Sequence, residues 1–552
     1  MIEDKNNIRR KIPVNEQVVL KEIEEFIGID LVQVTESSND VFKRKGKYGY
    51  RIINNHVAEL LLSHPYYPRG DKWRNSKPPR ITKLPASVER LEYLKSIDLS
   101  YQGLSKIPLP IFTVNSLEYL DLSANFLERI PNQIRFLQHI KQLNISINNF
   151  EMFPEIICSL KSLNRIVLYT NPIQSIPDSI VNLNELKEFN MCNTNISSLP
   201  ETIGSLYNLE KIDIHETNLT ELPHSLCNLV RLKFLDVSRT KLESLPKEFG
   251  NLSSLETLIL EYTYITEFPP SFGKLHNLAY LEMYKSKLKH IRSEFQGLYS
   301  LRKLNIQANE IQEISEGFGQ LSNLQEAMLE DNQIKMLPES ISNLQSLEHL
   351  ALINNKLKKI PNSIGNLKKL KKIELDQNQI EEIPDEIGSL DCLEELWISV
   401  NNLAKIPSSI ENLQNLKELS IGSNQITNLP VSLGNLENLE SLDASKNLLS
   451  SVSFLEMPHS ECKLKHLKVL NLASNQIANL PESIGELNTL KQLYLSSNRL
   501  HSLPESITHL QLEYLTINDN PLDQLSSSVK SWLDATLEKT RRWFDNNKIN
   551  VS

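Results

Sequence analysis

Side chains that could do chemistry are scarce in this chain, and one cysteine–histidine pair comes first. Cys192 and His215 stand 23 residues apart in the sequence, and a thiol beside an imidazole can act as a nucleophile with its base. The sequence offers no third group that would orient the histidine. We therefore expect no catalytic dyad.

The sequence motifs of common enzyme and metal sites are also missing. There is no G-x-x-x-x-G-K-[ST] loop, no H-E-x-x-H, no C-x-x-C and no G-x-S-x-G, which are the patterns of phosphate, zinc and acyl-transfer sites. Carboxylates are abundant, but they recur as solvated repeat residues and no metal or acid–base pair can be chosen among them. We expect no enzyme, no metal site and no cofactor.

The elements that position these side chains come from a unit of 23 residues, seen in LEHLALINNKLKKIPNSIGNLKK (347–369). Its first leucine-type position recurs from Leu94 to Leu439 in fifteen steps of 23, and again at Leu467, Leu490 and Leu512. Alternation in L-x-x-L-x-L predicts a short strand, and prolines such as Pro361 suit the start of a convex helix or 3-10 turn. We predict an α/β solenoid, curved, with a parallel β-sheet on its concave face.

An asparagine follows the strand in most repeats, as at Asn355. Its amide can donate to and accept from backbone groups of adjacent turns. The sites at Thr194, Thr217, Thr240, Thr263 and Ser286 carry a hydroxyl instead. This block is either a neutral replacement or a change of local curvature.

The pattern divides the chain into segments. We predict a disordered N-terminus at 1–13 and an N-terminal cap at 14–62, built from an amphipathic helix, a β-hairpin with its turn at Asn54-Asn55, and a degenerate first repeat. The solenoid then spans 81–525 with an insertion near 453–463, and a capping helix spans 526–545 before a tail at 546–552. One face of the first helix carries Val19, Ile23, Phe26 and Ile27, and one face of the last carries Val529, Trp532, Leu533, Leu537, Thr540 and Phe544.

A basic, proline-rich loop at 63–80 interrupts the pattern, with Trp73 isolated inside it. The loop is either a solvated insertion or a docking loop anchored by Trp73. The net charge of −9 disfavours a nucleic-acid partner. No apolar run is long enough for a membrane span, no secretory signal opens the chain, and the five scattered cysteines indicate a reducing setting. These features predict a cytoplasmic protein, and we expect a monomer.

The repeats at Leu347, Leu416 and Leu490 carry I/LPxxIxxLxxLxxLxLxxNxL. This pattern resembles the 23-residue class of intracellular Ras-group leucine-rich repeat proteins, and is similar to the arrays of Roco-type and prokaryotic relatives. The resemblance implies a scaffold that contacts small GTPases or a phosphatase through its concave face.

Large side chains gather on the predicted concave face in two places. One group mixes aromatic residues with acids and the other is centred on a tryptophan; the candidate binding residues are Tyr169, His215, Phe234, Asp236, Glu261, Tyr262, Tyr280, Glu282, Tyr284 and Trp397. Exposed aromatic residues are common hot spots of interfaces, and carboxylates among them favour a basic partner. The competing interpretation is packing of each ring on the next repeat. We predict a protein-binding scaffold or adaptor in intracellular signalling; the alternative is a secreted effector or a ligand-recognition receptor.

Overall fold

The computed structural model describes residues 12–34, 48–63, 80–456 and 463–546. The chain divides into Met1–Ile265 and Thr266–Ser552, here called unit 1 and unit 2, and each is considered by itself. Most of the basic loop with Trp73, the centre of the insertion, the first eleven residues and the last six lie outside the described ranges, so the predictions made for them stay predictions.

Unit 1 begins with helix α2 (Val14–Ile27), which ends at Gly28 in the left-handed conformation, at φ 70°. Val19, Leu20 and Ile23 are fully buried. Phe26, which the sequence places on the same apolar face, is 51% exposed, whereas Leu20 is fully buried.

The predicted hairpin is present as β2 (Gly49–Ile53) and β3 (His56–Leu61), paired antiparallel. Asn54 and Asn55 have φ of 51° and 66°, the pair of positive values that a tight primed turn requires. Strand β3 also pairs in parallel with the first regular strand, β4, so it begins the repeat sheet. A short strand that the sequence did not indicate, β1 (Val32–Gln33), pairs in parallel with β2.

The regular strands of both units are three residues long and stack in parallel at steps set by the repeat. In unit 1 they are β4 (Ser96–Asp98), β5 (Tyr119–Asp121), β6 (Gln142–Asn144), β7 (Arg165–Val167), β8 (Glu188–Asn190), β9 (Lys211–Asp213), β10 (Phe234–Asp236) and β11 (Thr257–Ile259). In unit 2 they are β12 (Tyr280–Glu282), β14 (Lys303–Asn305), β16 (Glu326–Met328), β17 (His349–Ala351), β18 (Lys372–Glu374), β19 (Glu395–Trp397), β20 (Glu418–Ser420), β21 (Ser441–Asp443), β22 (Val469–Asn471), β23 (Gln492–Tyr494) and β24 (Tyr514–Thr516).

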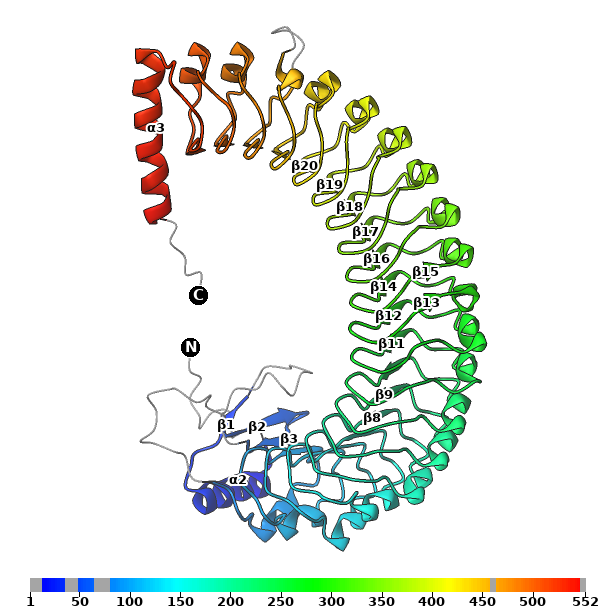
Figure 1. The fold of residues 1–552 in the computed structure, drawn as a ribbon. Coiled ribbons are helices and arrows are strands. Elements are labelled where there is room, and N and C mark those ends of the chain that lie inside the picture. The colour runs from blue at the N-terminus through cyan, green and yellow to red at the C-terminus, as the bar shows by residue number, and fades with distance from the viewer. Residues whose placement is uncertain (1–11, 35–47, 64–79, 457–462, 547–552) are drawn as a thin grey trace. The chain divides into compact units, whose positions relative to one another are not determined.

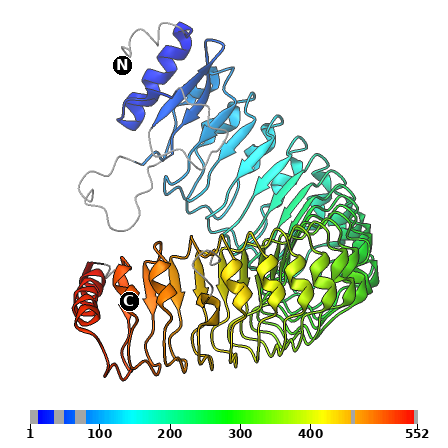
Figure 2. The ribbon, with the colours of Figure 1, turned by 90° about the horizontal axis from the view of Figure 1, so that it is seen from above.

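The 3-10 turns form a second row of elements within each unit, on the edge opposite the strands (Figures 1 and 2). They run from η2 (Ala86–Arg90) to η9 (Phe249–Asn251) in unit 1, and from η10 (Pro270–Lys274) to η20 (Glu505–His509) in unit 2. A proline precedes most of them, as Pro361 precedes η14 (Asn362–Asn366). The strand leucines and turn leucines between the two rows, such as Leu352 and Leu367, are fully buried.

The asparagine ladder is confirmed. The amide nitrogen of Asn355 donates to the carbonyls of Leu329 and Leu352 at 3.0 and 3.1 Å, and its oxygen accepts from the amide of Ile334 at 3.0 Å. The hydroxyl of Thr217 makes one such bond, to the carbonyl of Ile214 at 3.0 Å.

Two consecutive repeats of unit 2 form an extra strand pair on the turn side. Arg292 and Ser315 stand where other repeats have proline, and a proline has no N–H to donate. The Ser315 amide donates to the Ile291 carbonyl at 2.8 Å. A small parallel pair therefore forms from β13 (His290–Ile291) and β15 (Glu313–Ile314).

Unit 2 ends with helix α3 (Ser527–Asn546), whose buried residues Val529, Leu533 and Thr540 face the last strands. The Thr540 hydroxyl accepts from the amide of Leu515 in β24 at 3.0 Å. Within the described ranges, neither this helix nor α2 has the length and apolar character needed to cross a membrane.

Candidate functional site

The predicted binding residues lie on the strand side of both units. Phe234 and Asp236 flank the buried Leu235 in β10, so they point away from the core. Because paired strands are in register, Asp236 lies opposite Asp213 and Phe234 opposite Lys211. Unit 1 carries Tyr169, His215, Phe234, Asp236, Glu261 and Tyr262, and unit 2 carries Tyr280, Glu282, Tyr284 and Trp397.

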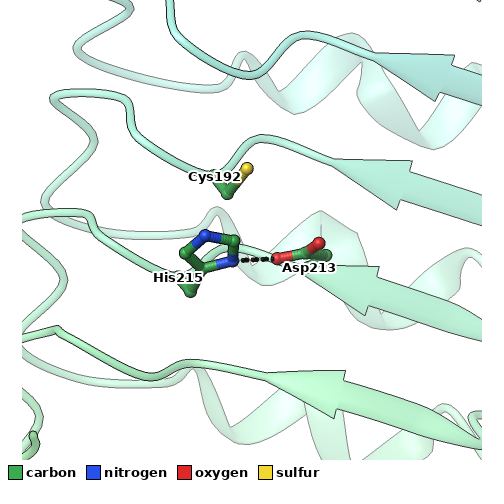
Figure 3. A group of neighbouring side chains, drawn as sticks. All are labelled: Cys192, Asp213 and His215. Carbon is green, nitrogen blue, oxygen red and sulfur yellow. Dashed lines mark hydrogen bonds and ion pairs between the residues drawn. The ribbon is translucent and has the colours of Figure 1, made fainter. Parts of the chain in front are cut away.

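A polar cluster in unit 1 surrounds His215. Its Nδ1 lies 2.7 Å from Oδ1 of Asp213 and 3.7 Å from Oδ2 of Asp236. Figure 3 shows the imidazole turned toward Asp213, with Cys192 on the preceding repeat. The expectation that no group orients this histidine is therefore wrong. Asp213 stands two residues before His215, and strand alternation puts both on one face.

The hydrogen bond with Asp213, supported by one with Cys192, raises the pKa of His215 to about 10 against the opposing effect of burial. These partners favour the protonated imidazole, so a proton must leave the ring before its nitrogen can bind another group. Burial raises the pKa of Asp236, although hydrogen bonds from Ser238 partly offset that effect.

Two of the candidate aromatic residues of unit 1 are covered by cations of the preceding repeat. Lys211 Nζ lies 4.5 Å from the ring centre of Phe234, and Arg239 Cζ lies 4.5 Å from that of Tyr262. Such cation–π contacts stabilise a ring that is only partly buried. Packing along the ladder accounts for part of this aromatic group.

In unit 2, Tyr280 is 44% exposed while Glu282 and Tyr284 are half-buried. Trp397 is half-buried beneath Lys372, whose Nζ lies 4.0 Å from the ring centre.

Lys372 also bridges two acids beside Trp397, because its Nζ forms ion pairs with Glu374 at 2.8 Å and Glu395 at 3.1 Å. The Trp397 indole nitrogen is buried, and its hydrogen bond with the Glu418 carboxylate lowers the pKa of that carboxylate against the larger effect of burial.

Carboxylates crowd the strand face around Trp397. We define the acidic face as the outward-facing residues of β16–β21 and the residues two positions after each strand: Glu326, Met328, Glu330, His349, Ala351, Ile353, Lys372, Glu374, Asp376, Glu395, Trp397, Ser399, Glu418, Ser420, Gly422, Ser441, Asp443 and Ser445. Seven of these are carboxylates and one is a lysine.

This crowding changes the protonation behaviour of the acidic face. Burial first, and then repulsion from Glu374 and Asp443, raise the pKa of Asp376 to about 6, although an amide hydrogen bond from Ser399 opposes them. Burial and Glu395 likewise raise the pKa of Glu418. Burial would also raise the pKa of Glu374, but hydrogen bonds from His349 and Lys372 lower it.

Sequence reasoning found Trp397 but missed the extent of the acids beside it. The sequence analysis did not single out Glu395, Glu418 and Asp443, because they lie at other strand positions or in repeats without large side chains. Reading all strand rows together at the 23-residue spacing would have found them.

Comparisons with known proteins agree on the class of fold. A family model described as a leucine-rich repeat region matches residues 224–293, 283–378 and 362–459. Models described as leucine rich repeat and as leucine rich repeats in two copies match 464–522 and 437–485. Together the matches span more than half of the chain. No curated protein matches this sequence.

Solved structures resemble the chain over most of its length. The Leptospira interrogans leucine-rich repeat protein LIC12759 is 27% identical with a TM-score of 0.59, over 82% of this chain and 97% of that one. The plant peptide hormone receptor RGFR1, solved in complex with RGF2, is 27% identical with a TM-score of 0.62, over 88% of this chain and 84% of that one. A TDR receptor is 28% identical with a TM-score of 0.57, over 78% and 85%. With the parallel strands, the asparagine ladder and the 23-residue register, these likenesses establish that the chain is a leucine-rich repeat protein.

Proposed function

We propose that this protein is a noncovalent protein-binding scaffold or adaptor of intracellular signalling, and that its strand face binds a partner with a basic surface. The leucine-rich repeat fold is one that presents a broad binding surface for proteins and peptides. The fold alone does not choose the partner, so the proposal rests on the surface chemistry.

The single observation that carries the proposal is the charge of the acidic face. Seven carboxylates stand there against one lysine, and burial together with repulsion from Glu374 and Asp443 raises the pKa of Asp376 to about 6. A cationic partner would relieve this repulsion, and complementary charge raises both association rate and specificity. Among signalling proteins, small GTPases are the class that the repeat resemblance implies.

The proposed contacts combine this charge with the large side chains. Trp397 supplies an apolar anchor within the acidic face, as aromatic hot spots do in other interfaces. Tyr280, Glu282 and Tyr284 form a second patch on unit 2. On unit 1 the proposed contacts are Tyr169, His215, Phe234, Asp236, Glu261 and Tyr262.

A labelled decalysine peptide is the probe for the acidic face, with fluorescence anisotropy as the readout. Neutralising three carboxylates in Glu374→Gln/Asp376→Asn/Asp443→Asn should weaken binding by about tenfold or more, since three charges leave the face. The matched control removes the same charge from the 3-10 turn side in Glu382→Gln/Asp385→Asn/Glu386→Gln. Equal weakening by both variants would mean that net charge alone attracts the probe, and would contradict the proposal.

The protein partner is then sought by pull-down with the intact chain, repeated with Trp397→Ala and with Tyr280→Ala/Tyr284→Ala. A genuine partner should be lost from at least one variant and should present lysine or arginine residues at the contact. Retention by both variants would place the interface elsewhere.

A ligand-recognition receptor or a secreted effector is the second candidate. The likeness to RGFR1, which was solved with a peptide hormone, favours it. Fractionation of producing cells separates the two functions, because a scaffold of intracellular signalling stays in the cytosolic fraction while an effector or receptor ectodomain leaves it.

A further inference from the structure

Three side chains of different chemistry converge on the strand face of unit 1. The sulfur of Cys192, a carboxylate oxygen of Asp213 and a ring nitrogen of His215 all lie within 4.8 Å of one another. Among the described residues, no other group of three or more such side chains meets this standard. The convergence follows from the repeat, because Cys192 and His215 occupy the same position in successive units.

A thiolate, an imidazole and a carboxylate together form a donor set that zinc accepts in proteins. Soft sulfur excludes magnesium and calcium as preferred ions, whereas the imidazole and sulfur suit zinc and its neighbours in the d-block. Tetrahedral zinc with bonds of about 2.0–2.3 Å would hold these donor atoms roughly 3.3–3.8 Å apart. The donor atoms of the cluster lie within 4.8 Å of one another, so binding an ion would require them to move closer together.

The residues around the cluster orient it. Asn190 donates from Nδ2 to Oδ2 of Asp213 at 2.9 Å, and its Oδ1 accepts from the amide of Cys192 at 3.3 Å. One asparagine thus holds a carboxylate and the backbone of the cysteine. Hydrogen bonds of this kind fix the geometry of ligands in metal sites.

A fourth donor is at hand in Asp236. Its Oδ1 accepts from the amide and hydroxyl of Ser238 at 2.9 and 2.6 Å. The other oxygen, Oδ2, faces His215 at 3.7 Å. All of these residues stand on or just after the adjacent strands β8, β9 and β10; sites built on strands are held more precisely than sites on mobile loops.

We propose that Cys192, Asp213 and His215 bind one divalent d-block ion of the zinc type, with Asp236 or water completing the coordination. Cys192 is 8% exposed as a whole residue, and the His215 side chain is about one-third exposed. An ion can therefore enter from the strand face. This site does not include any residue of the acidic face of unit 2, although His215 and Asp236 are also among the unit 1 contacts proposed for the partner.

The test uses the full chain, freed of metal with a chelator and titrated with Co²⁺ and then Zn²⁺. One equivalent of Co²⁺ should produce a thiolate-to-cobalt charge-transfer band, and Zn²⁺ should displace it. Cys192→Ser should abolish the band, and Asp213→Asn or His215→Ala should weaken binding by about tenfold to a hundredfold. The control is Cys158→Ser, a buried cysteine of the same unit outside the cluster, which should leave the titration unchanged.

Thiol alkylation of the unaltered protein gives a readout that does not depend on the folding of a variant. Zn²⁺ should slow modification of Cys192, located by peptide mass spectrometry, by about tenfold or more relative to the exposed Cys392. Absence of a cobalt band, a band that survives Cys192→Ser, or equal protection of both cysteines would each overturn the proposal.

Discussion

Exchanging asparagine and threonine at the ladder position tests what holds successive repeats together. In Asn355→Thr, the hydroxyl can keep the bond to the Leu352 carbonyl, as Thr217 does with Ile214. It cannot also accept from the amide of Ile334, which Asn355 now satisfies at 3.0 Å. The donation to the carbonyl of Leu329 is lost as well.

The magnitude follows from these bonds. A buried amide left without an acceptor costs about 1–3 kcal/mol, and a lost neutral hydrogen bond costs about 1 kcal/mol. We therefore expect Asn355→Thr to lower the free energy of unfolding of its surroundings by about 2–4 kcal/mol. The reverse exchange, Thr217→Asn, should stabilise unit 1 by about 1 kcal/mol, because the Ile196 amide has no acceptor among the described residues.

Repeat proteins do not always unfold as one cooperative system, so hydrogen exchange measured peptide by peptide is the assay. Peptides that contain Ile334 should lose protection in Asn355→Thr by roughly thirtyfold or more, the equivalent of about 2 kcal/mol, while distant repeats stay unchanged. A change below about 0.5 kcal/mol in both exchanges would refute the reasoning. The Thr/Ser block would then be a neutral replacement.

Three further predictions concern unit 2, with urea unfolding as the common measurement. Asp376→Asn should stabilise it at pH 7.5 by about 1–2 kcal/mol after allowance for solvent screening. The pKa of Asp376 is raised to about 6 in the folded protein, so ionisation of this carboxyl opposes folding as the pH rises through that window. The advantage of the variant should therefore disappear below about pH 4, where the carboxyl is protonated in both states. Gly388→Ala should destabilise unit 2 by about 1–3 kcal/mol, since an added Cβ would meet a backbone oxygen at 2.3 Å. Gly422→Ala should cost less, because the nearest atom there is a movable side-chain oxygen at 3.2 Å. Thr540→Val should cost about 1–3 kcal/mol by leaving the amide of Leu515 without its acceptor. The first prediction is contradicted if Asp376→Asn still stabilises the protein at pH 3.5. The second is contradicted if Gly388→Ala and Gly422→Ala have equal effects, and the third if Thr540→Val leaves the unfolding midpoint unchanged.

The sequence predicts the fold well because each repeat is specified by local rules that do not depend on distant contacts. The leucine spacing and proline position determine strand and turn, and Asn54-Asn55 determines the hairpin turn. Features that depend on contacts between elements are not predicted from the sequence pattern. Phe26 fits the apolar face of its helix but is half exposed, because the orientation of a helix on a sheet is set by packing that the helix sequence does not contain.

Short pairings depend on residues outside the strand itself and escape pattern reading for that reason. Strand β1 has two residues, too few for any alternation. The pair β13 and β15 forms where Arg292 and Ser315 replace prolines, and the Ser315 amide, which a proline would lack, donates to the Ile291 carbonyl. That replacement is visible in the sequence, but its consequence appears only once the turn edges of neighbouring repeats are placed side by side.

At the candidate sites, too, the sequence predicts which residues lie on the strand face but not which of their side chains bond to one another. The sequence placed Asp213 among the acids near His215 and located Trp397, but it did not show that Asp213 orients the histidine through a hydrogen bond. The two proposed activities can be tested separately, because the metal cluster belongs to unit 1 and the acidic face to unit 2. Chelation should therefore leave decalysine binding unchanged, and the triple neutralisation that includes Asp376 should leave the cobalt band intact. A change in either cross-test would mean that the bound ion alters the acidic face, which neither site's local geometry predicts.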